Sequence, residues 1–179
     1  MTLYFRLLLM FIRCFFIRKQ SVLTPARMRF RVLPFDCDIN LHLNNARYFS
    51  FMDLGRLQLT AQLGLLKEFY QERRWVPVIA GVEMTFVRAL DPFQSFELVT
   101  RILAWDEYYV YMEQRFESEG KLFAIGLVKG AFLAGNKKHP VSAVMESLEP
   151  GAMSPPLPET VLCWQGLAQA KKKGSMNET

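Results

Sequence analysis

The sequence predicts an α+β fold in which one long, buried helix packs against a run of antiparallel strands. Apolar residues recur with a helical period from residue 44 to residue 63. From residue 76 to residue 134 the pattern becomes strand-like, and short turns separate the segments. Short connections favour antiparallel neighbours. The length of 179 residues suits one domain with an extension at each end.

The composition indicates a folded protein of a reducing compartment. Apolar residues make up 51% of the chain and charged residues 22%, which argues against a disordered chain. Cys14, Cys37 and Cys163 lie far apart and form no CxxC pair, so neither a disulfide framework nor a zinc site is predicted. His42 and His139 are too few for a His-rich metal centre. We therefore expect no metal, no cofactor and a cytoplasmic location.

The net charge of +5 is concentrated at the two ends of the chain. Residues 1–31 carry seven Lys or Arg and no acid, and residues 170–179 carry three Lys and one Glu. Residues 32–169 carry twelve Lys or Arg and sixteen acids. A mildly acidic body does not suit the neutralisation of phosphates along a duplex, so no nucleic-acid partner is expected.

Residues 1–24 are predicted to form an apolar, basic helical extension. Arg6 and Arg13 lie seven residues apart and share one stripe of a helix whose remaining surface is apolar. The run is shorter than the about 20 apolar residues of a membrane span. It also lacks the charge order and the cleavage site of a signal peptide. The apolar surface of this helix has two possible contacts. One is a membrane interface at residues 3–19, and the other is the protein itself or a second subunit.

The body of the predicted domain, residues 25–140, begins with a strand. Arginines alternate with apolar residues over 27–32, which is typical of a half-buried strand. The long helix follows over 44–63. Its stripe holds Tyr48, Met52, Gly55, Leu59 and Leu63. Because few charged residues interrupt its apolar surface, the helix is expected to be enclosed on most sides.

Four further strands are expected after a shorter helical piece around residues 65–73. They cover residues 76–87, 95–105, 108–117 and 121–134. The first of them should place Val78, Ala80, Val82, Met84 and Phe86 on one face. Residues 141–179 form the C-terminal extension. It comprises an apolar-periodic stretch over 141–148, a Pro-rich linker over 154–158, a helix over 159–170 and a lysine tail.

The segment from Asp36 to Asn44 carries polar residues at every second position. If its backbone is extended, Asp36, Asp38, Asn40, His42 and Asn44 project from one face. The segment leads into the long helix, where Asn44 or Asn45 can act as N-cap. Free backbone N–H groups at a helix N-terminus can hold an oxyanion beside a general base. The same alternation is also ordinary for a strand with one solvated face.

The run from Asp36 to Tyr48 resembles the signature of hotdog-fold acyl-CoA thioesterases related to the 4-hydroxybenzoyl-CoA enzyme. It is most similar to the thioesterase superfamily member six-like branch, which is membrane-associated. The resemblance extends through residues 86–93, 100–106 and 114–116, and covers about residues 27–134. It implies a long helix wrapped by an antiparallel sheet, the layout predicted from periodicity. Leu41 stands where many bacterial relatives have Gly.

The resemblance implies hydrolysis of acyl-CoA thioesters to free acid and coenzyme A. Asp38 matches the catalytic carboxylate, acting as general base or as nucleophile. Asn40 and His42 match positions that orient water or polarise the carbonyl. Asn44, Asn45 and the following backbone N–H groups match the site of the thioester oxygen. The acyl-CoA substrate and a homodimer or higher homo-oligomer are the implied partners.

Several residues have a second interpretation. Asp53 matches the helix carboxylate that another branch uses for catalysis, but it is equally consistent with an ion pair to Arg56. Arg47, Tyr48 and Arg88 are candidate substrate-binding residues, and the two arginines are also typical of solvated charges. The alternative function is a non-catalytic acyl-binding or membrane-tethered hotdog protein.

Overall fold

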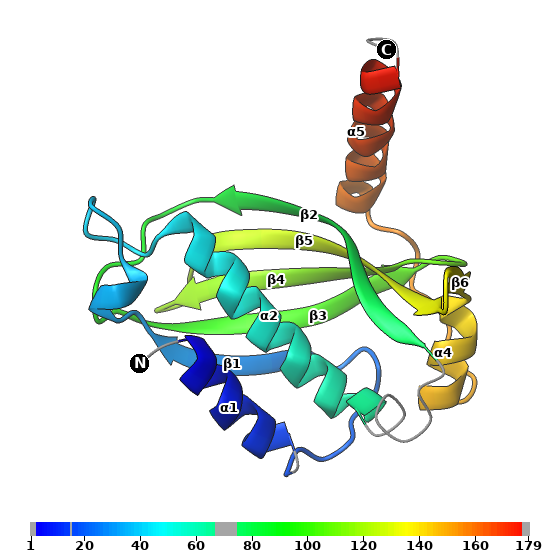
Figure 1. Cartoon of the computed structure of the whole chain (residues 1–179), viewed down its shortest axis with the longest axis horizontal. Coiled ribbons are helices and arrows are strands. Elements are labelled where there is room, and N and C mark those ends of the chain that lie inside the picture. Colours follow the sequence, from blue (N-terminus) through cyan, green and yellow to red (C-terminus); the bar gives the residue numbers. More distant parts are fainter. Residues whose placement is uncertain (1–2, 15, 67–74, 177–179) are drawn as a thin grey trace.

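A six-stranded antiparallel sheet wraps round helix α2, Asn45–Gln62 (Figure 1). The order of its strands is β1-β3-β4-β5-β2, and β6 pairs with β5. The computed structural model describes residues 3–14, 16–66 and 75–176. The strands are β1 Ala26–Arg31, β2 Val76–Phe86, β3 Ser95–Trp105, β4 Val110–Ser118, β5 Lys121–Ala134 and β6 Lys137–His139. The α+β layout predicted from periodicity is confirmed.

The five predicted strands are observed with nearly the predicted bounds, the short strand β6 was not predicted, and the pattern of β2 differs. The register between β2 and β5 shifts between Ile79 and Gly81, which marks a β-bulge. A bulge changes the face to which the following side chains point. The prediction of one continuous face from Val78 to Phe86 is therefore wrong. The helical piece expected around residues 65–73 falls largely on residues 67–74, outside the described residues.

Helix α2 is capped at its N-terminus and approaches the sheet closely at Gly55. Asn44 is its N-cap, and the Asn44 Oδ1 accepts a hydrogen bond of 2.8 Å from the Ala46 N–H. At Gly55 the helix approaches β3 so closely that a Cβ atom would lie 2.6 Å from Thr100 Oγ1. The predicted stripe is buried throughout, as are Phe51 and Leu54. The enclosed helix expected from the sequence is confirmed.

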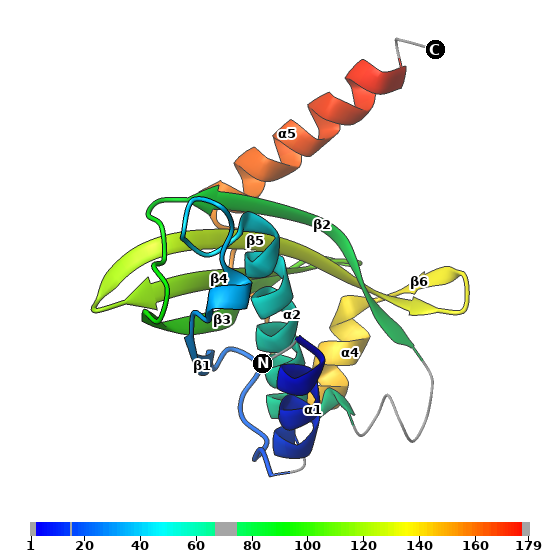
Figure 2. The same cartoon turned by 60° about the vertical axis from the view of Figure 1, so that its left-hand side comes forward.

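Helix α1, Leu3–Cys14, packs beside α2 and near β1 (Figures 1 and 2). Met10 is 3% exposed and belongs to the main core, and Arg6 is 8% exposed. Leu8, Leu9 and Ile12 remain 56%, 46% and 52% exposed. Packing on the protein itself is thus confirmed for one face of α1, and the opposite face is apolar and uncovered. Among the described residues, no helix is long and apolar enough to cross a bilayer.

The C-terminal extension contains two helices. Helix α4, Val141–Leu148, buries Val144 and Met145 in a second core cluster against the C-terminal end of α2. Helix α5, Glu159–Met176, projects away from the sheet (Figures 1 and 2). Its Trp164 ring lies against the position where a Cβ of Gly81 would stand, at 3.4 Å. The helix predicted over residues 159–170 is therefore confirmed, and it is longer than predicted.

Candidate active site

The segment between β1 and α2 forms a closed loop. It begins with the 3-10 helix η1, Pro34–Asp36, and Cys37 and Leu43 then form an isolated antiparallel bridge. Inside the bridge, the Asp38 N–H donates to the His42 carbonyl at 3.0 Å. The chain can reverse here because Leu41 adopts a left-handed conformation, with φ of 57°. The extended backbone considered for Asp36 to Asn44 is therefore wrong, and the polar residues do not share one face.

Asp36 points into the protein, away from the other polar residues of the loop. Its side chain forms two hydrogen bonds with the Arg6 guanidinium, at 3.0 Å and 2.7 Å. The Leu33 N–H donates to Asp36 Oδ2 at 3.1 Å. The Asp36 carbonyl accepts from the Asn44 N–H at 2.9 Å. Asp36 thus anchors both ends of the loop and ties it to α1.

Asp38 and His42 are brought together at the surface of the loop. The distance from His42 Nδ1 to Asp38 Oδ1 is 3.6 Å, and the side chains are 33% and 22% exposed. Asp38 Oδ1 also accepts a hydrogen bond of 2.9 Å from the Asn40 N–H. Asp38 Oδ2 has no hydrogen-bond partner within the described part of the chain. One carboxylate oxygen is therefore fixed in place and the other is available to a water molecule.

The N-terminus of α2 begins directly after this loop. The Asn44 side chain caps the helix, and the Asn44 carbonyl accepts from the Arg47 N–H at 2.8 Å. Asn45 is exposed, and its backbone N–H has no partner among residues 16–66 and the other described ranges. A free N–H at a helix N-terminus suits a developing negative charge. Asn44 thus supports the helix end, while Asn45 offers a donor.

The three candidate substrate-binding residues occupy different environments. Arg47 donates to the Phe35 carbonyl at 3.4 Å, and exposed Arg88 donates to the Leu122 carbonyl at 3.2 Å. Tyr48 is 2% exposed, and its ring packs edge-on against Phe86 and Phe116. Burial raises the pKa of Tyr48 to about 12. In this chain Tyr48 lies in the core, whereas Arg47 and Arg88 remain at the surface.

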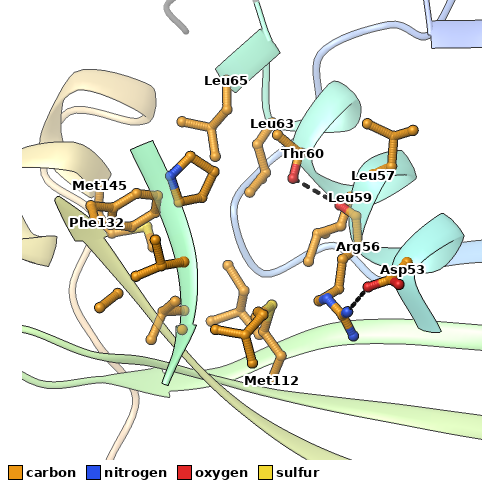
Figure 3. A pocket seen from close by; sticks show the side chains of 17 residues that line it. Asp53, Arg56, Leu57, Leu59, Thr60, Leu63, Leu65, Met112, Phe132 and Met145 are labelled. Atoms are coloured by element: carbon orange, nitrogen blue, oxygen red, sulfur yellow. Dashed lines mark hydrogen bonds and ion pairs between the residues drawn. The ribbon is translucent and has the colours of Figure 1, made fainter. Parts of the chain in front are cut away.

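An apolar cavity of about 220 Å³ lies between the C-terminal half of α2 and the sheet (Figure 3). Asp53 and Arg56 form its polar rim, and their side chains are 70% and 16% exposed. The two side chains form the ion pair considered in the sequence. The deeper lining is apolar and includes Leu59, Leu63, Phe132 and Met145.

Arg56 is held from both sides, a feature that the sequence does not predict. Its Nη1 donates to Gln114 Oε1 at 2.8 Å, and its Nη2 contacts Asp53. Gln114 is fully buried and donates to the Met52 carbonyl at 3.0 Å and to Thr100 Oγ1 at 2.9 Å. Burial lowers the pKa of the Arg56 guanidinium, and the Asp53 charge acts in the opposite direction. The only local signal of this network is a polar Gln in an otherwise alternating strand.

Similarity to known proteins decides the family. A model described as the thioesterase-like superfamily matches residues 32–165, which include the loop, α2 and every strand of the sheet except β1. The chain belongs to the thioesterase-like superfamily. The resemblance seen in the Asp36 to Tyr48 run is therefore confirmed.

Two curated relatives are similar to this superfamily member over part of their length. Protein THEM6 of Xenopus laevis is 31% identical over 134 residues, which cover 74% of this chain and 63% of the frog protein. The chain thus spans less than two thirds of that relative. The probable thioesterase YBR096W of Saccharomyces cerevisiae is 34% identical over 87 residues, 46% of this chain and 36% of the yeast protein.

A solved structure supports the fold of this superfamily member. The 1,4-dihydroxy-2-naphthoyl-CoA thioesterase Slr0204 from Synechocystis superposes with a TM-score of 0.62 and 10% identity. The superposition covers 70% of this chain and 95% of that one. At this identity the likeness concerns the fold alone. The predicted hotdog fold is confirmed.

Proposed function

We propose that the protein hydrolyses acyl-CoA thioesters to a free acid and coenzyme A. The observation that carries the proposal is Asp38, whose Oδ1 accepts from the Asn40 N–H and lies 3.6 Å from His42 Nδ1, in the loop that leads into α2. A fixed carboxylate beside a free backbone donor combines a general base with an oxyanion site. Membership in the thioesterase-like superfamily supports thioester hydrolysis as the reaction class.

In the proposed reaction, Asp38 Oδ2 takes a proton from a water molecule. The water oxygen attacks the thioester carbonyl carbon, and the carbonyl oxygen becomes negative. The Asn45 N–H donates to this oxyanion, and His42 orients the water. The C–S bond then breaks, the acid leaves, and the thiolate of coenzyme A takes the proton from Asp38, which restores the carboxylate. General base catalysis of this kind contributes a factor of about 10²–10⁴ to the rate.

Coenzyme A is the proposed carrier because two arginines lie near the loop. Arg47 and Arg88 are surface arginines that follow the loop in α2 and follow β2, respectively. The loop and the segment after β2 lie side by side, since the Leu43 N–H donates to the Leu90 carbonyl at 2.8 Å. Guanidinium groups bind phosphates through paired hydrogen bonds. The proposed role of both arginines is to contact coenzyme A phosphates.

The acyl chain is proposed to occupy an apolar cavity. The cavity between α2 and the sheet has an apolar lining, which suits an acyl chain, and Asp53 lies at its rim (Figure 3). Asp53 therefore remains the alternative catalytic carboxylate. Asp53 forms an ion pair with Arg56, which favours a role in positioning Arg56 over a role as general base.

A homodimer through the edge of β2 is the proposed assembly. β2 ends the sheet, and its Ile79 and Phe86 are 46% and 43% exposed. An apolar edge strand with unpaired backbone groups favours pairing with a second copy. Replacing Ile79 with Lys is expected to yield monomers in light scattering after size exclusion, and unchanged dimers would contradict this interface.

We also propose a cytoplasmic location with peripheral membrane contact through α1. Leu8, Leu9 and Ile12 form an apolar face that no described residue covers, and exposed Phe16 follows the helix. Such a face suits the boundary between headgroups and acyl chains. Flotation of the full chain with neutral vesicles is expected for the wild type and is expected to be lost in Ile12→Glu. A wild type that stays unbound would contradict the contact.

Thiol release from a panel of acyl-CoAs tests the catalytic proposal. Asp38→Asn is expected to lose at least about 100-fold in kcat, because it keeps the shape but removes the base. Asp91→Asn is the matched control, since Asp91 is an exposed acid next to Leu90. Binding of acyl-CoA without turnover by the wild type would favour the non-catalytic alternative. A loss of kcat in Asp53→Asn rather than in Asp38→Asn would assign the role of catalytic carboxylate to Asp53.

A further inference from the structure

A groove of about 400 Å³ lies between α1 and the edge strand β1. Every charged side chain that lines it is an arginine: Arg6, Arg13, Arg29 and Arg31. The rest of the lining is apolar and comes from Leu9, Met10, Met28, Phe30 and Leu33. The groove thus combines a purely basic charge with an apolar floor.

Three of the four arginines have guanidinium donors without a partner in the described part of the chain. Arg13 makes no side-chain hydrogen bond within residues 3–14, 16–66 and 75–176. Arg31 donates through Nε to the Phe93 carbonyl at 2.8 Å, which leaves both its Nη groups. Arg29 is 89% exposed, and its ion-pair partner Glu97 lies at 3.6 Å. Glu97 is already bonded to Arg27 at 2.6 Å. The groove therefore keeps a surplus of positive charge.

Arg6 has a different function in the groove. Its Nη1 and Nη2 are both bonded to Asp36, and the pair is buried. This pair joins α1 to η1, which directly follows β1. The same pair anchors the loop that carries Asp38. The groove and the candidate active site are consequently joined through one ion pair.

The exposed apolar face of α1 borders the groove. Leu9 belongs to both, and Ile12 and Phe16 continue the face at 52% and 81% exposure. A ligand that matches both surfaces has an anionic head and an apolar body that stays outside the groove. Free phosphate matches the arginines alone. A lipid in a bilayer matches the arginines with its headgroup and the apolar face with its acyl chains.

We propose that the α1–β1 groove binds the phosphate headgroup of an anionic phospholipid. The inference rests on the membrane contact proposed for α1 and adds its lipid selectivity. Arg13, Arg29 and Arg31 contact the headgroup, while Leu9 and Ile12 enter the acyl region of the same leaflet. Binding in this way sets the Asp38 loop beside the bilayer, where acyl chains are concentrated.

Flotation of the full chain on two vesicle types tests the proposal. One type is phosphatidylcholine alone, and the other contains in addition phosphatidylserine. We expect the wild type to favour the anionic vesicles and the double variant Arg13→Gln/Arg29→Gln to lose that preference. Each basic residue near an anionic surface contributes about a fivefold change in partition, so the pair should cost roughly 30-fold. The variant should still bind neutral vesicles through the apolar face.

The control is Arg101→Gln/Lys121→Gln, which removes the same net charge from β3 and the start of β5. An equal loss in this control would show a non-specific effect of net charge and overturn the proposal. Equal binding of the wild type to both vesicle types would also overturn the headgroup proposal. The proposed membrane contact through α1 would still hold. If the wild type binds neither vesicle type, both the headgroup proposal and the α1 membrane contact are overturned. Thiol release from acyl-CoA still tests the catalytic proposal separately. Soluble glycerophosphate that abolishes vesicle binding at low concentration would assign the groove to a free phosphate compound instead.

Discussion

Arg6 Nη2 lies 2.7 Å from Asp36 Oδ2, and the two side chains are only 7% and 5% exposed. The guanidinium also stacks over the Phe51 ring at 4.8 Å from its centroid. Arg6 comes from α1 and Asp36 from η1, so the pair fastens the N-terminal extension to the beginning of the candidate site. A buried pair of this kind is tightly constrained, because neither charge has water as an alternative partner.

The first prediction concerns the loss of one member of this pair. Arg6→Met should lower the free energy of unfolding by about 3–5 kcal/mol, because it leaves the Asp36 carboxylate buried without a counter-charge. Urea unfolding followed by tryptophan fluorescence measures the change. Arg13→Met is the control, because Arg13 shares the helix stripe of Arg6 but is exposed, and the expected change is within about 0.5 kcal/mol. Equal effects of the two substitutions would contradict the importance of the pair.

A double substitution separates the charge from the packing. Arg6→Met combined with Asp36→Leu should recover part of the lost stability, because two apolar side chains can replace a buried ion pair. Stability no better than that of Arg6→Met alone would mean that the hydrogen bond from the Leu33 N–H to Asp36 dominates.

The sequence predicts the fold well because the fold follows from local periodicity. The stripe of α2 from Tyr48 to Leu63 and the alternation in β1 depend on neighbours a few residues away. The bulge in β2 escaped prediction because it depends on pairing with β5, about 50 residues further along. Local pattern shows which faces are apolar, but it does not show how two strands align.

The candidate site was predicted in part. The short distance between Asp38 and His42 fits the motif. The sequence offered Asn44 and Asn45 as N-cap candidates, and Asn44 is the N-cap. The extended geometry is wrong because the chain reverses at Leu41, and Asp36 points inward to Arg6, 30 residues earlier in the chain. Arg56 and Gln114 are likewise 58 residues apart. Polar side chains that find partners across the fold leave no periodic signal.

The second prediction concerns the left-handed conformation of Leu41. Its φ is 57° and the residue is 72% exposed, so the side chain gains little from burial. The left-handed region costs a non-Gly residue about 1–2 kcal/mol. Gly removes this strain but adds about 0.5–1 kcal/mol of unfolded-state entropy. Leu41→Gly should therefore stabilise the protein by about 0.5–1 kcal/mol in urea unfolding.

Ile39 provides the matched control in the same loop. It is 96% exposed and is not among the residues with positive φ. Ile39→Gly should cost about 0.5–1 kcal/mol, since only the entropic term applies. A destabilising Leu41→Gly would show that the Leu41 side chain supports the loop in some other way.

The third prediction compares two helical glycines. A Cβ at Gly55 would lie 2.6 Å from Thr100 Oγ1 and 2.8 Å from Leu98 Cδ2. Gly55→Ala should destabilise the protein by about 1–3 kcal/mol, because overpacking outweighs the better helix propensity of Ala. At Gly166 in α5 nothing lies within 4 Å of the added atom. Gly166→Ala should instead raise the helicity of α5, seen in circular dichroism. Tolerance of Gly55→Ala would contradict the close approach of α2 to β3.

The last prediction concerns acid and the carboxylate of Glu149. The Val22 N–H donates to Glu149 Oε2 at 2.8 Å, and the Ser21 hydroxyl donates to Oε1 at 3.2 Å. The hydrogen bond from Val22, then that from Ser21, then the charge of Lys19 lower the pKa of Glu149 from its ordinary value of 4.5. A lowered pKa in the folded state means that the unfolded state binds the proton more readily. The stability from Glu149 is therefore present above pH 4.5 and is lost as the pH falls through the folded-state pKa.

Urea midpoints measured from pH 6 to pH 3 test this dependence on Glu149. Glu149→Gln should have a lower midpoint than the wild type at pH 6, and the gap should narrow as the pH falls. Glu119→Gln is the control, because the Glu119 carboxylate makes no hydrogen bond to the part of the chain that the structure describes. Its midpoints should run parallel to those of the wild type. A constant gap for Glu149→Gln would mean that the Glu149 side chain supports the 19–22 segment by packing, because a contribution from its charge must disappear in acid.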